Sequence, residues 1–444
     1  MTPDRTHTPG GKTAEDRLQA LLDGRYRDPN TGRPVALATR SLVIADSLVG
    51  MEAELVEALD MGRRLAVVSD VSTHDVLGAQ VERALAGRFG IQSLILPADP
   101  LPDDATAERL RAATRDVDGY LAVGSGTIND LTKFVSAQAG KPYAVFGTAP
   151  SMNGYVSLTA SITMHGHKMT VPAQAPRGAF FDLAVLAAAP ARMIRAGLGD
   201  SVCRTTAQVD WLLSHLLLGT EYRSLPFDLL AQDEPALLDC ASALTRGDTD
   251  AVRTLIRTLV LSGLGTAIVG SSAPASQGEH LVSHYVDMLA DPARTPIFHG
   301  EQVGVTTLSL ARLQHAMLDA RPVVHPDTLA DADIRSHFGD ELSGSVIEEF
   351  AAKRIDKAKA EHLNAIIADR WDQIAEALSA VLLPNARLES VLTAAGAPTT
   401  PADIGLDRVF YETALYHARE IRNRFTMLDL AAAGSRLVAL SQTI

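Results

Sequence analysis

The hydrophobic positions of this chain follow two different periodicities, one in each half of the sequence. Between residues 41 and 186, short apolar runs with β-branched side chains begin at residues 41, 65, 93, 120, 143 and 179. Segments with a helical spacing of apolar residues, such as 76–85 and 107–114, lie between several of them. Apolar strands that alternate with helices are typical of a parallel sheet covered on both faces. Such a sheet binds ligands at the carboxyl ends of its strands.

Beyond Pro190 the apolar positions recur at helical spacing over long stretches, for example 249–264, 345–380 and 409–432. Strand-like runs become rare in this half of the sequence. We therefore predict that the second half of the chain is helical throughout.

The hydrophobic periodicity changes within residues 187–192, where a proline interrupts the strand pattern and favours the first turn of a new helix. This predicts an α/β domain over residues 14–189 and an all-α domain over residues 190–444. The polar residues 1–13 are expected to form a disordered tail.

The composition narrows the kind of partner. A net charge of −13 and a pI near 5.4 argue against nucleic acid or an anionic membrane, because phosphates attract basic surfaces. The apolar runs are shorter than the ~20 residues of a membrane helix, so no membrane insertion is expected. The polar start also lacks the order of a secretory signal. Cys203 and Cys240 are too few for a disulfide framework. We expect a cytoplasmic protein that binds a small molecule.

A glycine-rich turn follows the apolar run at residue 120, in "VGSGTINDLTKF". Gly124, Ser125 and Gly126 stand where a strand gives way to a helix. Glycines let the backbone approach a ligand closely, and the free amides at a helix N-terminus suit a phosphate. The pattern is not GxGxxG, so an ordinary turn is the alternative.

Asp70 ends the apolar run that begins at residue 65. An acid at the end of a strand in a nucleotide-binding sheet accepts hydrogen bonds from ribose hydroxyls. Helix capping is the alternative for a single aspartate. Together with the glycine turn, Asp70 favours a dinucleotide ligand.

Three histidines lie close together in the second half of the chain. His280 and His284 are four residues apart, so they share one face of a helix, and His299 follows at the start of the next helix. A histidine pair with a distant third ligand is typical of a divalent metal site, and nearby carboxylates such as Glu279 and Glu301 orient the rings. Ordinary core or surface histidines are the alternative.

An open metal site also calls for a carboxylate ligand. "GLGD" supplies Asp200 near the start of the helical half, in a segment of small and apolar residues. Helix capping is again the alternative.

Several motifs in order carry a resemblance to a known family. They are "GSGTINDLTK", "TAPSMNGYVS", "GLGD" with a later "DW", "SSAPASQGEHLVSH", "HGEQVG" and "RNRFTMLDLA". The chain resembles the sn-glycerol-1-phosphate dehydrogenases from about residue 40 to residue 435. That family belongs with glycerol dehydrogenase, iron-containing alcohol dehydrogenases and dehydroquinate synthase.

The resemblance implies a dehydroquinate synthase-like fold, with an NAD(P)-binding α/β domain, an all-α domain and a cleft between them. It implies Asp200, His280 and His299 as metal ligands, and it places His284 and Asn153 beside the substrate as catalytic residues. The implied cofactor contacts are Asp70, Gly124, Ser125, Gly126, Thr148, Ser151 and Ser157.

The implied reaction is the reduction of dihydroxyacetone phosphate to sn-glycerol 1-phosphate, a step of phospholipid metabolism. NAD(H) or NADP(H) supplies the hydride, and one divalent metal polarises the ketone. Zinc is expected first, although nickel and iron also suit histidine and carboxylate. A homo-oligomer is expected.

One residue departs from the family pattern. The chain reads "SMNGY" where the family reads "SMDGY", so Asn153 replaces an acid near the substrate. This keeps open a dehydrogenase for another polyol or for a phosphorylated or acidic ketone, and a non-catalytic relative. A dehydroquinate synthase-like cyclase is disfavoured, because that group reads "GHTFGH" where this chain has "EHLVSH".

Overall fold

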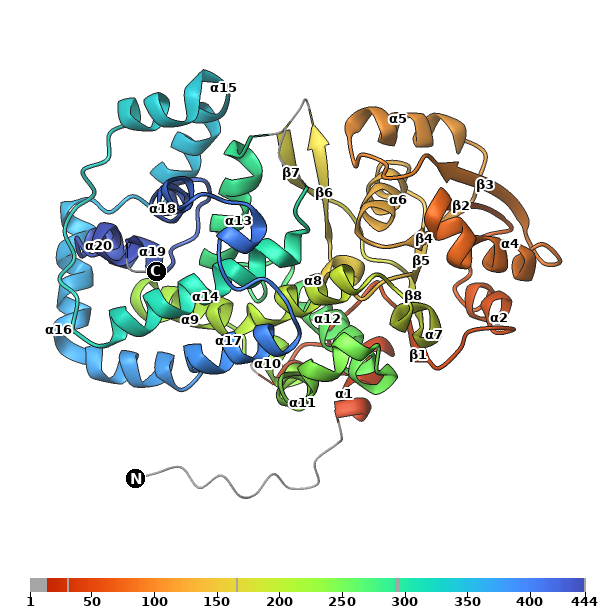
Figure 1. Cartoon of the computed structure of the whole chain (residues 1–444), viewed down its shortest axis with the longest axis horizontal. Helices are drawn as coiled ribbons and strands as arrows, with labels where there is room; N and C mark the ends of the chain where they lie inside the picture. The colour runs from red at the N-terminus through yellow and green to blue at the C-terminus, as the bar shows by residue number, and fades with distance from the viewer. Residues whose placement is uncertain (1–13, 30–31, 165–166, 292–295, 443–444) are drawn as a thin grey trace.

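A computed structural model describes residues 14–29, 32–164, 167–291 and 296–442 of the chain. Figure 1 shows a sheet-containing part and a helical part lying beside each other. The predicted tail, residues 1–13, lies outside the described residues.

The first part is built on a parallel sheet of six strands, in the order β1-β8-β5-β4-β2-β3. All six apolar runs of the sequence contribute a strand, which confirms the predicted α/β architecture. The three central strands β4, β5 and β8 are buried at every residue, and their sequences are unbroken apolar runs for that reason. The strands are β1 (Ser41–Ala45), β2 (Arg64–Asp70), β3 (Gly90–Leu96), β4 (Gly119–Gly124), β5 (Tyr143–Gly147) and β8 (Gly178–Asp182).

The last apolar run, 179–186, is only partly a strand. β8 ends at Asp182, whose carboxylate accepts hydrogen bonds from the amides of Ala184 (3.0 Å) and Val185 (3.3 Å) and so begins a helix. That helix is α7 (Leu183–Ala187). The other helices of this part are α2 (Glu52–Glu57), α3 (Val71–Thr73), α4 (Ala79–Leu85), α5 (Asp104–Ala113) and α6 (Gly126–Gln138), with the short turns η1 (His74–Gly78) and η2 (Gly154–Val156). The first helix, α1 (Ala14–Leu22), packs against the helical part, where Leu21 clusters with Leu225 and Leu229.

An antiparallel hairpin of β6 (Thr159–Met164) and β7 (His167–Pro172) adds a feature that the sequence pattern did not predict. It stands between the sheet and the helical part (Figure 1). The amide of Ser161 donates to Asp130 (2.9 Å), and the amide of Thr163 donates to the carbonyl of Pro102 (2.7 Å). Hydrogen bonds to the α/β part thus hold the hairpin in place. Its two strands are short and contain polar residues, so the apolar pattern of the sequence does not reveal them.

The second part is helical, as predicted, but two of its long periodic stretches are interrupted. The stretch 345–380 breaks at residues 352–356, and the stretch 409–432 breaks at residues 421–426. The helices are α8 (Ala191–Val202), α9 (Arg204–Leu218), α10 (Leu225–Leu230), α11 (Asp233–Cys240), α12 (Thr249–Val269), α13 (Gly278–Leu289), α14 (His299–Leu318), α15 (Asp331–Ala351), α16 (Lys357–Ser379), α17 (Asn385–Ala394), α18 (Arg408–His417), α19 (Met427–Ala433) and α20 (Leu437–Ser441), with the turns η3 (Ala241–Arg246), η4 (Ala402–Ile404) and η5 (Ala418–Glu420).

One buried lysine connects the two breaks. Lys353 lies in the first break, and its ammonium donates to the carbonyl of Arg424 in the second break (2.6 Å) and to the carboxylate of Asp429 (3.0 Å). A buried ammonium requires hydrogen-bond acceptors, and a carbonyl that lies outside a helix supplies one of them here. Side-chain periodicity does not report such a long-range contact.

Helix α12 contributes many residues to the largest hydrophobic cluster. It is the one helix of the described residues that is long and apolar enough to cross a membrane. However, 67% of its most apolar window is buried inside the protein, where it packs against α8, α10 and α11. Its apolar character therefore fits a core helix.

The two parts share packing at their junction. The largest hydrophobic cluster includes Tyr155 from the α/β part and Leu259 from α12. The predicted domain boundary between residues 189 and 190 falls in the link between α7 and α8, and it stays a prediction.

Helices α8 and α14 cross at very short range because glycines face each other at the crossing. A Cβ added to Gly300 would lie 1.8 Å from the carbonyl oxygen of Ala196. A Cβ added to Gly199 would lie 2.0 Å from the carbonyl oxygen of Gly300. Backbone packs on backbone here, so no larger residue fits without separating the helices. The crossing brings Asp200 beside the first residue of α14, His299.

We predict that Gly300→Ala lowers the free energy of unfolding by about 1–3 kcal/mol, the usual cost of overpacking. Urea denaturation of the purified protein measures this. Gly344→Ala is the matched control, because Gly344 lies in α15 with open space around it, and alanine there should be neutral or stabilising. Equal stability of Gly300→Ala and wild type would contradict the close crossing.

Candidate active site

A cavity of about 340 Å³ lies between the two parts of the molecule. The α/β part contributes the turn after β4, including Ser125 and Gly126, and the segment 151–161. The helical part contributes residues of α8, α13 and α14 and of the segment 270–276. Its walls thus come from both halves of the sequence.

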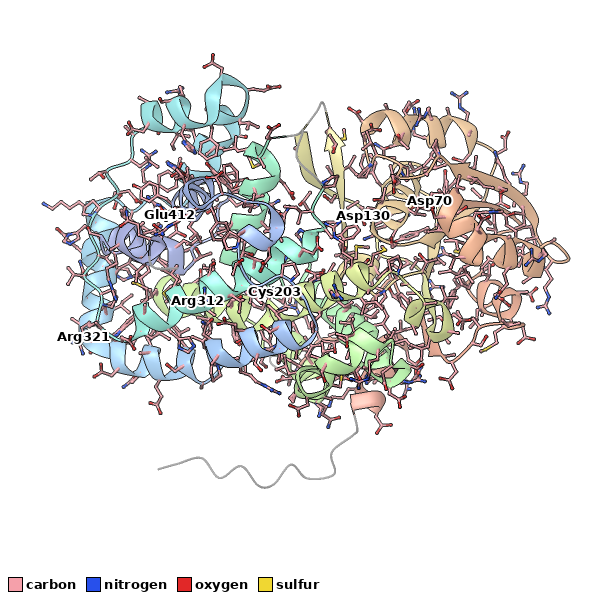
Figure 2. All side chains as sticks on the ribbon, in the orientation of Figure 1. Asp70, Asp130, Cys203, Arg312, Arg321 and Glu412 are labelled. Carbon is pink, nitrogen blue, oxygen red and sulfur yellow. The ribbon has the colours of Figure 1, made fainter. Side chains whose placement is uncertain are left out.

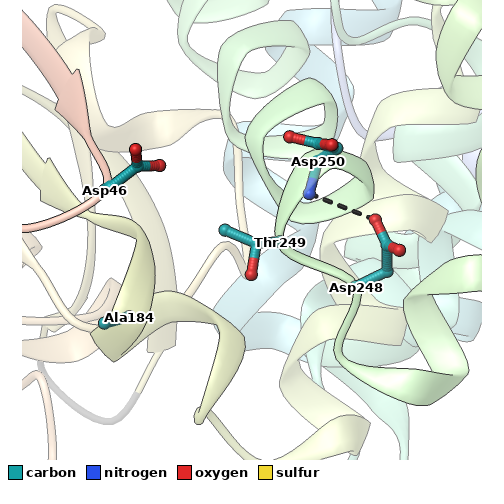
Figure 3. A pocket seen from close by; sticks show the side chains of 5 residues that line it. All are labelled: Asp46, Ala184, Asp248, Thr249 and Asp250. Atoms are coloured by element: carbon teal, nitrogen blue, oxygen red, sulfur yellow. Dashed lines mark hydrogen bonds between the residues drawn. The ribbon is translucent and has the colours of Figure 1, made fainter.

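A second hollow is lined by acidic groups, Asp46, Asp248 and Asp250, with Ala184 and Thr249 (Figure 3). Asp248 caps α12, because its carboxylate accepts from the amides of Asp250 (3.1 Å) and Ala251 (3.0 Å). Asp46 forms an ion pair with Arg253 (2.5 Å). Capping and ion pairing account for these acids, so the first cavity is the candidate site.

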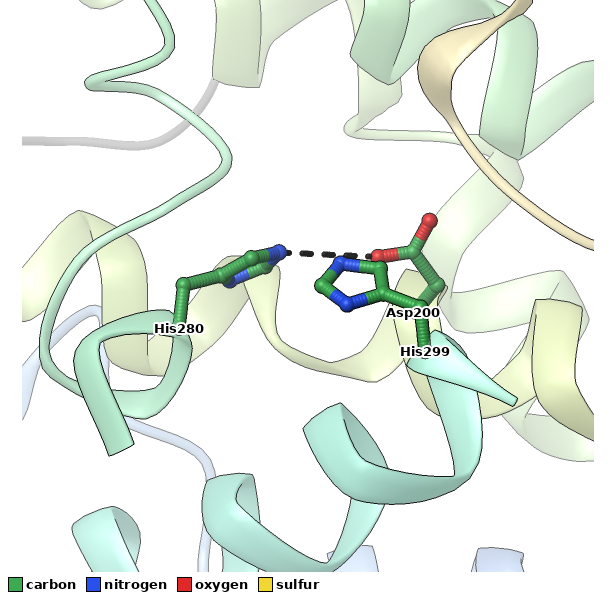
Figure 4. Close-up of side chains that lie close together, drawn as sticks. All are labelled: Asp200, His280 and His299. Carbon is green, nitrogen blue, oxygen red and sulfur yellow. Dashed lines mark ion pairs between the residues drawn. The ribbon is translucent and has the colours of Figure 1, made fainter. Parts of the chain in front are cut away.

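The predicted metal ligands meet in the first cavity (Figure 4). One donor atom from each of Asp200, His280 and His299 lies within 4.8 Å of the other two. The His280 Nε2 atom is 3.7 Å from Asp200 Oδ1. Asp200 is 1% exposed and His280 is 5% exposed, so a bound ion would be largely shielded from water.

Hydrogen bonds orient two of these side chains. The amide of Asn153 donates to Asp200 Oδ2 (2.7 Å), and His280 Nδ1 lies 2.9 Å from Glu279 Oε1. Asp200 Oδ1 and His280 Nε2 are left facing each other, and Asp200 Oδ1 accepts no hydrogen bond within the described part of the chain. A buried carboxylate oxygen beside an imidazole nitrogen is a suitable donor pair for a divalent cation.

The two carboxyl groups beside His280, those of Glu279 and Asp200, have pKa values shifted in opposite directions. Burial opposes ionisation of Glu279, yet the hydrogen bond and charge of His280 leave the pKa of Glu279 below its usual value. Burial raises the pKa of Asp200, and the proximity of His280 counteracts this. A cation at the three ligands would favour the ionised form of Asp200.

The two glutamates that accompany the histidines in sequence have different roles. Glu279 is fully buried and also accepts from the hydroxyl of Thr206 (3.0 Å) and the amide of Gln277 (2.8 Å). Glu301 instead forms a two-pronged ion pair with Arg192, with both N–O distances at 2.7 Å. Only Glu279 therefore supports a candidate ligand directly.

Cys203, Glu279 and His280 also lie within metal-binding distance of one another. The thiol of Cys203 donates to the carbonyl of Asp200 (3.1 Å), and burial raises the pKa of Cys203 well above its usual range. Because a metal takes the thiolate, this second group is better described as a hydrogen-bonded support for α8 and α13.

His284 lies one turn beyond His280 on α13 and also lines the cavity. Its ring centroid is 5.9 Å from that of His280 and 6.1 Å from that of His299. The helical spacing thus predicted that His280 and His284 lie on one face of α13. A catalytic role for His284 stays a prediction.

The predicted cofactor residues divide into two groups. Ser125, Gly126, Ser151 and Ser157 line the cavity, with Ser125 and Gly126 at the N-terminus of α6. Gly124 and Thr148 are not among the described residues that line it, and they are joined by a hydrogen bond from the Thr148 amide to the Gly124 carbonyl (3.2 Å).

Asp70 ends β2, as predicted, and caps the helix that follows. Its carboxylate accepts from the amide of Thr73 (2.8 Å), and its own amide donates to the Thr73 hydroxyl (3.0 Å). Asp70 lies in the α/β part (Figure 2) and is not among the described residues that line the cavity. The capping alternative is therefore present, and the cofactor contact stays a prediction.

Two residues of "NDLTK" contribute to the site in ways that the sequence analysis missed. Asp130 lines the cavity and is labelled in Figure 2. Lys133 is fully buried, and its ammonium donates to the carbonyls of Gly154 (2.6 Å) and Thr159 (3.0 Å) and the hydroxyl of Ser157 (3.1 Å). Burial lowers the pKa of Lys133. The sequence signal that could have revealed this role is a lysine on the apolar face of a predicted helix.

Comparison with known proteins places the chain in a class. A family model described as iron-containing alcohol dehydrogenase matches residues 43–190. A probable glycerol dehydrogenase from Sinorhizobium meliloti 1021 has a TM-score of 0.60 at 18% identity and covers 91% of this chain and 98% of that one. Glycerol dehydrogenase from Schizosaccharomyces pombe has a TM-score of 0.62 at 16% identity and covers 91% and 90%. The fold is therefore that of the iron-containing alcohol dehydrogenases and their relatives.

Sequence relatives define the family within that class. Glycerol-1-phosphate dehydrogenase [NAD(P)+] from Geobacillus stearothermophilus is 31% identical over 401 residues, which cover 87% of this chain and 91% of the relative. The enzyme of that name from Pyrococcus furiosus is 32% identical over 276 residues, covering 62% and 78%. The chain belongs to the glycerol-1-phosphate dehydrogenase family. It is an NAD(P)-dependent oxidoreductase.

We predict that His280→Ala abolishes stoichiometric metal binding without unfolding the protein, because a cavity ligand is not a core residue. Glu279→Gln should weaken metal affinity by about 10–100-fold, since it removes the carboxylate that orients His280. Metal analysis after dialysis against a chelator measures both effects. His362→Ala is the control, because His362 is exposed on α16. Full metal content in His280→Ala would overturn the ligand assignment.

Proposed function

We propose that the protein reduces dihydroxyacetone phosphate to sn-glycerol 1-phosphate with NADH or NADPH and one divalent metal. The observation that carries the proposal is the meeting of Asp200, His280 and His299 in the cavity that Ser125 and Gly126 also line. The names of the relatives support the same reaction.

Asp200 Oδ1, His280 Nε2 and His299 would hold the metal, and three protein ligands leave a position for a substrate oxygen. When bound, the metal polarises the ketone and stabilises the negative charge that forms on its oxygen. Zinc is proposed first, and nickel or iron would suit the same ligands. The chain itself contributes orientation, because the Glu279 and Asn153 contacts hold two ligands in place.

The cofactor is proposed to place its phosphates at the N-terminus of α6. Helix α6 begins at Gly126, and both Ser125 and Gly126 line the cavity. The first amides of a helix have no partner within it, and helix N-termini favour negative charge. The nicotinamide supplies the hydride. Gly126 permits a close approach of the cofactor, because a Cβ placed there would have only the flexible side chain of Met152 within 4 Å among the described residues.

His284 and Asn153 are proposed to contact the substrate, since both line the cavity beside the candidate ligands. An imidazole and an amide there offer hydrogen bonds to a hydroxyl or to the oxygen that becomes an alcohol. We further propose a cytoplasmic homo-oligomer that acts in phospholipid metabolism.

Incubating the metal-loaded protein with NADH and dihydroxyacetone phosphate, and following absorbance, tests the proposed function. We expect NADH oxidation that depends on the metal and yields sn-glycerol 1-phosphate. Chiral analysis of the product excludes the opposite enantiomer. A protein that oxidises NADH with another ketone, but not with this one, would overturn the substrate while leaving the reaction class intact.

We predict that Asn153→Asp changes turnover of dihydroxyacetone phosphate and leaves metal content unaltered. The backbone amide of residue 153 contacts Asp200 in either case, whereas the side chain gains a charge. If charge-assisted contacts of about 1–3 kcal/mol are missing in wild type, the variant gains about 5- to 150-fold in kcat/KM. Steady-state kinetics measure this. A family-like rate in wild type with no gain in the variant would show that Asn153 has not altered substrate choice.

A further inference from the structure

The cavity has a cationic end as well as a metal-ligand end. Arg422 is the only arginine or lysine among the described residues that line the cavity. It lies in the break 421–426, between η5 and α19, and its guanidinium donates to the hydroxyl of Thr170 on β7 (3.1 Å). The helical part thus presents this cation to the cavity beside the hairpin.

The charge of Arg422 is not neutralised by an ion pair. No carboxylate among the described residues lies within ion-pair distance of its guanidinium. Other arginines near the cavity and α9 are paired, such as Arg192 with Glu301 and Arg204 with Glu234. Burial lowers the pKa of Arg422, which the nearby charge of Glu349 counteracts. A half-buried guanidinium without a carboxylate partner is suited to an anionic ligand.

Arg424 does not line the cavity itself but donates hydrogen bonds to two serines that do. Its guanidinium donates to the carbonyl of Ser276, to the Ser276 hydroxyl (3.1 Å) and to the Ser272 hydroxyl (2.6 Å). Burial and the charge of Arg422 lower the pKa of Arg424 to about 10. Ser272, Ser276 and Arg422 all line the cavity. Arg424 orients the two serine hydroxyls from outside the lining.

Buried ion pairs hold the two arginines in place. Lys353 donates to the carbonyl of Arg424, and it also pairs with Asp429 (2.9 Å). Arg419 pairs with Asp327 (3.0 Å) just before the break. A ligand would therefore meet a cationic surface that is already ordered, which reduces the entropic cost of binding.

We propose that Arg422, with the hydroxyls of Ser272 and Ser276, binds the phosphate of a phosphorylated ketone substrate. This proposal rests on the proposed function and names the residues that select a phosphorylated substrate over a plain polyol. A guanidinium and two hydroxyls match the acceptor oxygens of a phosphate monoester. These residues belong to the helical part, as do Asp200, His280 and His299, whereas the glycine turn proposed for the cofactor phosphates belongs to the α/β part.

The variant Arg422→Met tests the proposal through the ratio of two substrates. We expect KM for dihydroxyacetone phosphate to rise about 10- to 100-fold, the effect of losing charge-assisted hydrogen bonds. Turnover of unphosphorylated dihydroxyacetone and the Kd for NADH, measured by fluorescence, should stay unchanged. Arg422→Lys should recover part of the loss, because it restores the charge without the planar fork. Arg321→Met is the control, since Arg321 forms only a surface pair with Asp372 and an exposed contact to the carbonyl of Ala368.

Other outcomes overturn the proposal. An unchanged KM for dihydroxyacetone phosphate would show that Arg422 does not bind the phosphate. If Arg422→Met binds NADH more weakly and loses the same factor of activity with dihydroxyacetone phosphate and with dihydroxyacetone, Arg422 binds the cofactor phosphates instead. Thermal melting of Arg422→Met excludes a folding defect as the cause of any loss.

A binding measurement separates this proposal from the proposed function. If wild type binds dihydroxyacetone phosphate in calorimetry but does not reduce it, the proposed reaction fails, and weaker binding to Arg422→Met still supports the phosphate site. Equal binding to both proteins, or no binding of dihydroxyacetone phosphate or inorganic phosphate to wild type, would overturn the phosphate site.

Discussion

One buried carboxylate joins the helices on which the candidate site is built. Asp210 lies on α9 and is fully buried. It accepts hydrogen bonds from the amide of Gly278 at the start of α13 (3.1 Å), the amide of Met427 at the start of α19 (2.9 Å) and the side chain of Gln314 on α14 (3.0 Å). Two helix N-termini thus direct their unpaired amides and positive dipole ends at one carboxylate. Removing it would leave several buried donors without acceptors.

The two ends of the cavity depend on this junction. His280 follows Gly278 by two residues on α13, and Arg424 precedes Met427 by three residues. Asp210 therefore relates the position of a candidate metal ligand to that of Arg424, which orients two serines of the proposed phosphate site. The glycine crossing of α8 and α14 adds the remaining ligands, because it is the close contact at Gly300 that places Asp200 next to His299.

The sequence predicted the features that depend on local pattern. Each central strand reads as an apolar run because both faces of the sheet are covered. The pair His280 and His284 shares a helix face because four residues make about one turn. His299 and Asp200 were candidate ligands from their residue types and positions, and the resemblance implied the same set. The features that were missed depend on contacts between distant residues. Lys133 donates to the carbonyl of Gly154, 21 positions away, and Lys353 donates to the carbonyl of Arg424, 71 positions away.

The structure shows which atoms of Asn153, the residue that replaces the family aspartate, contact the candidate metal ligand Asp200. In the sequence, asparagine in place of an acid near the substrate left the substrate open and kept a non-catalytic relative as an alternative. In the structure, the group that contacts Asp200 is the backbone amide of Asn153, which every residue except proline possesses. Gly263 keeps the loop in this position, since a Cβ there would lie 2.4 Å from the carbonyl oxygen of Asn153. The hydrogen bond that supports the candidate metal ligand is thus independent of the side chain at 153.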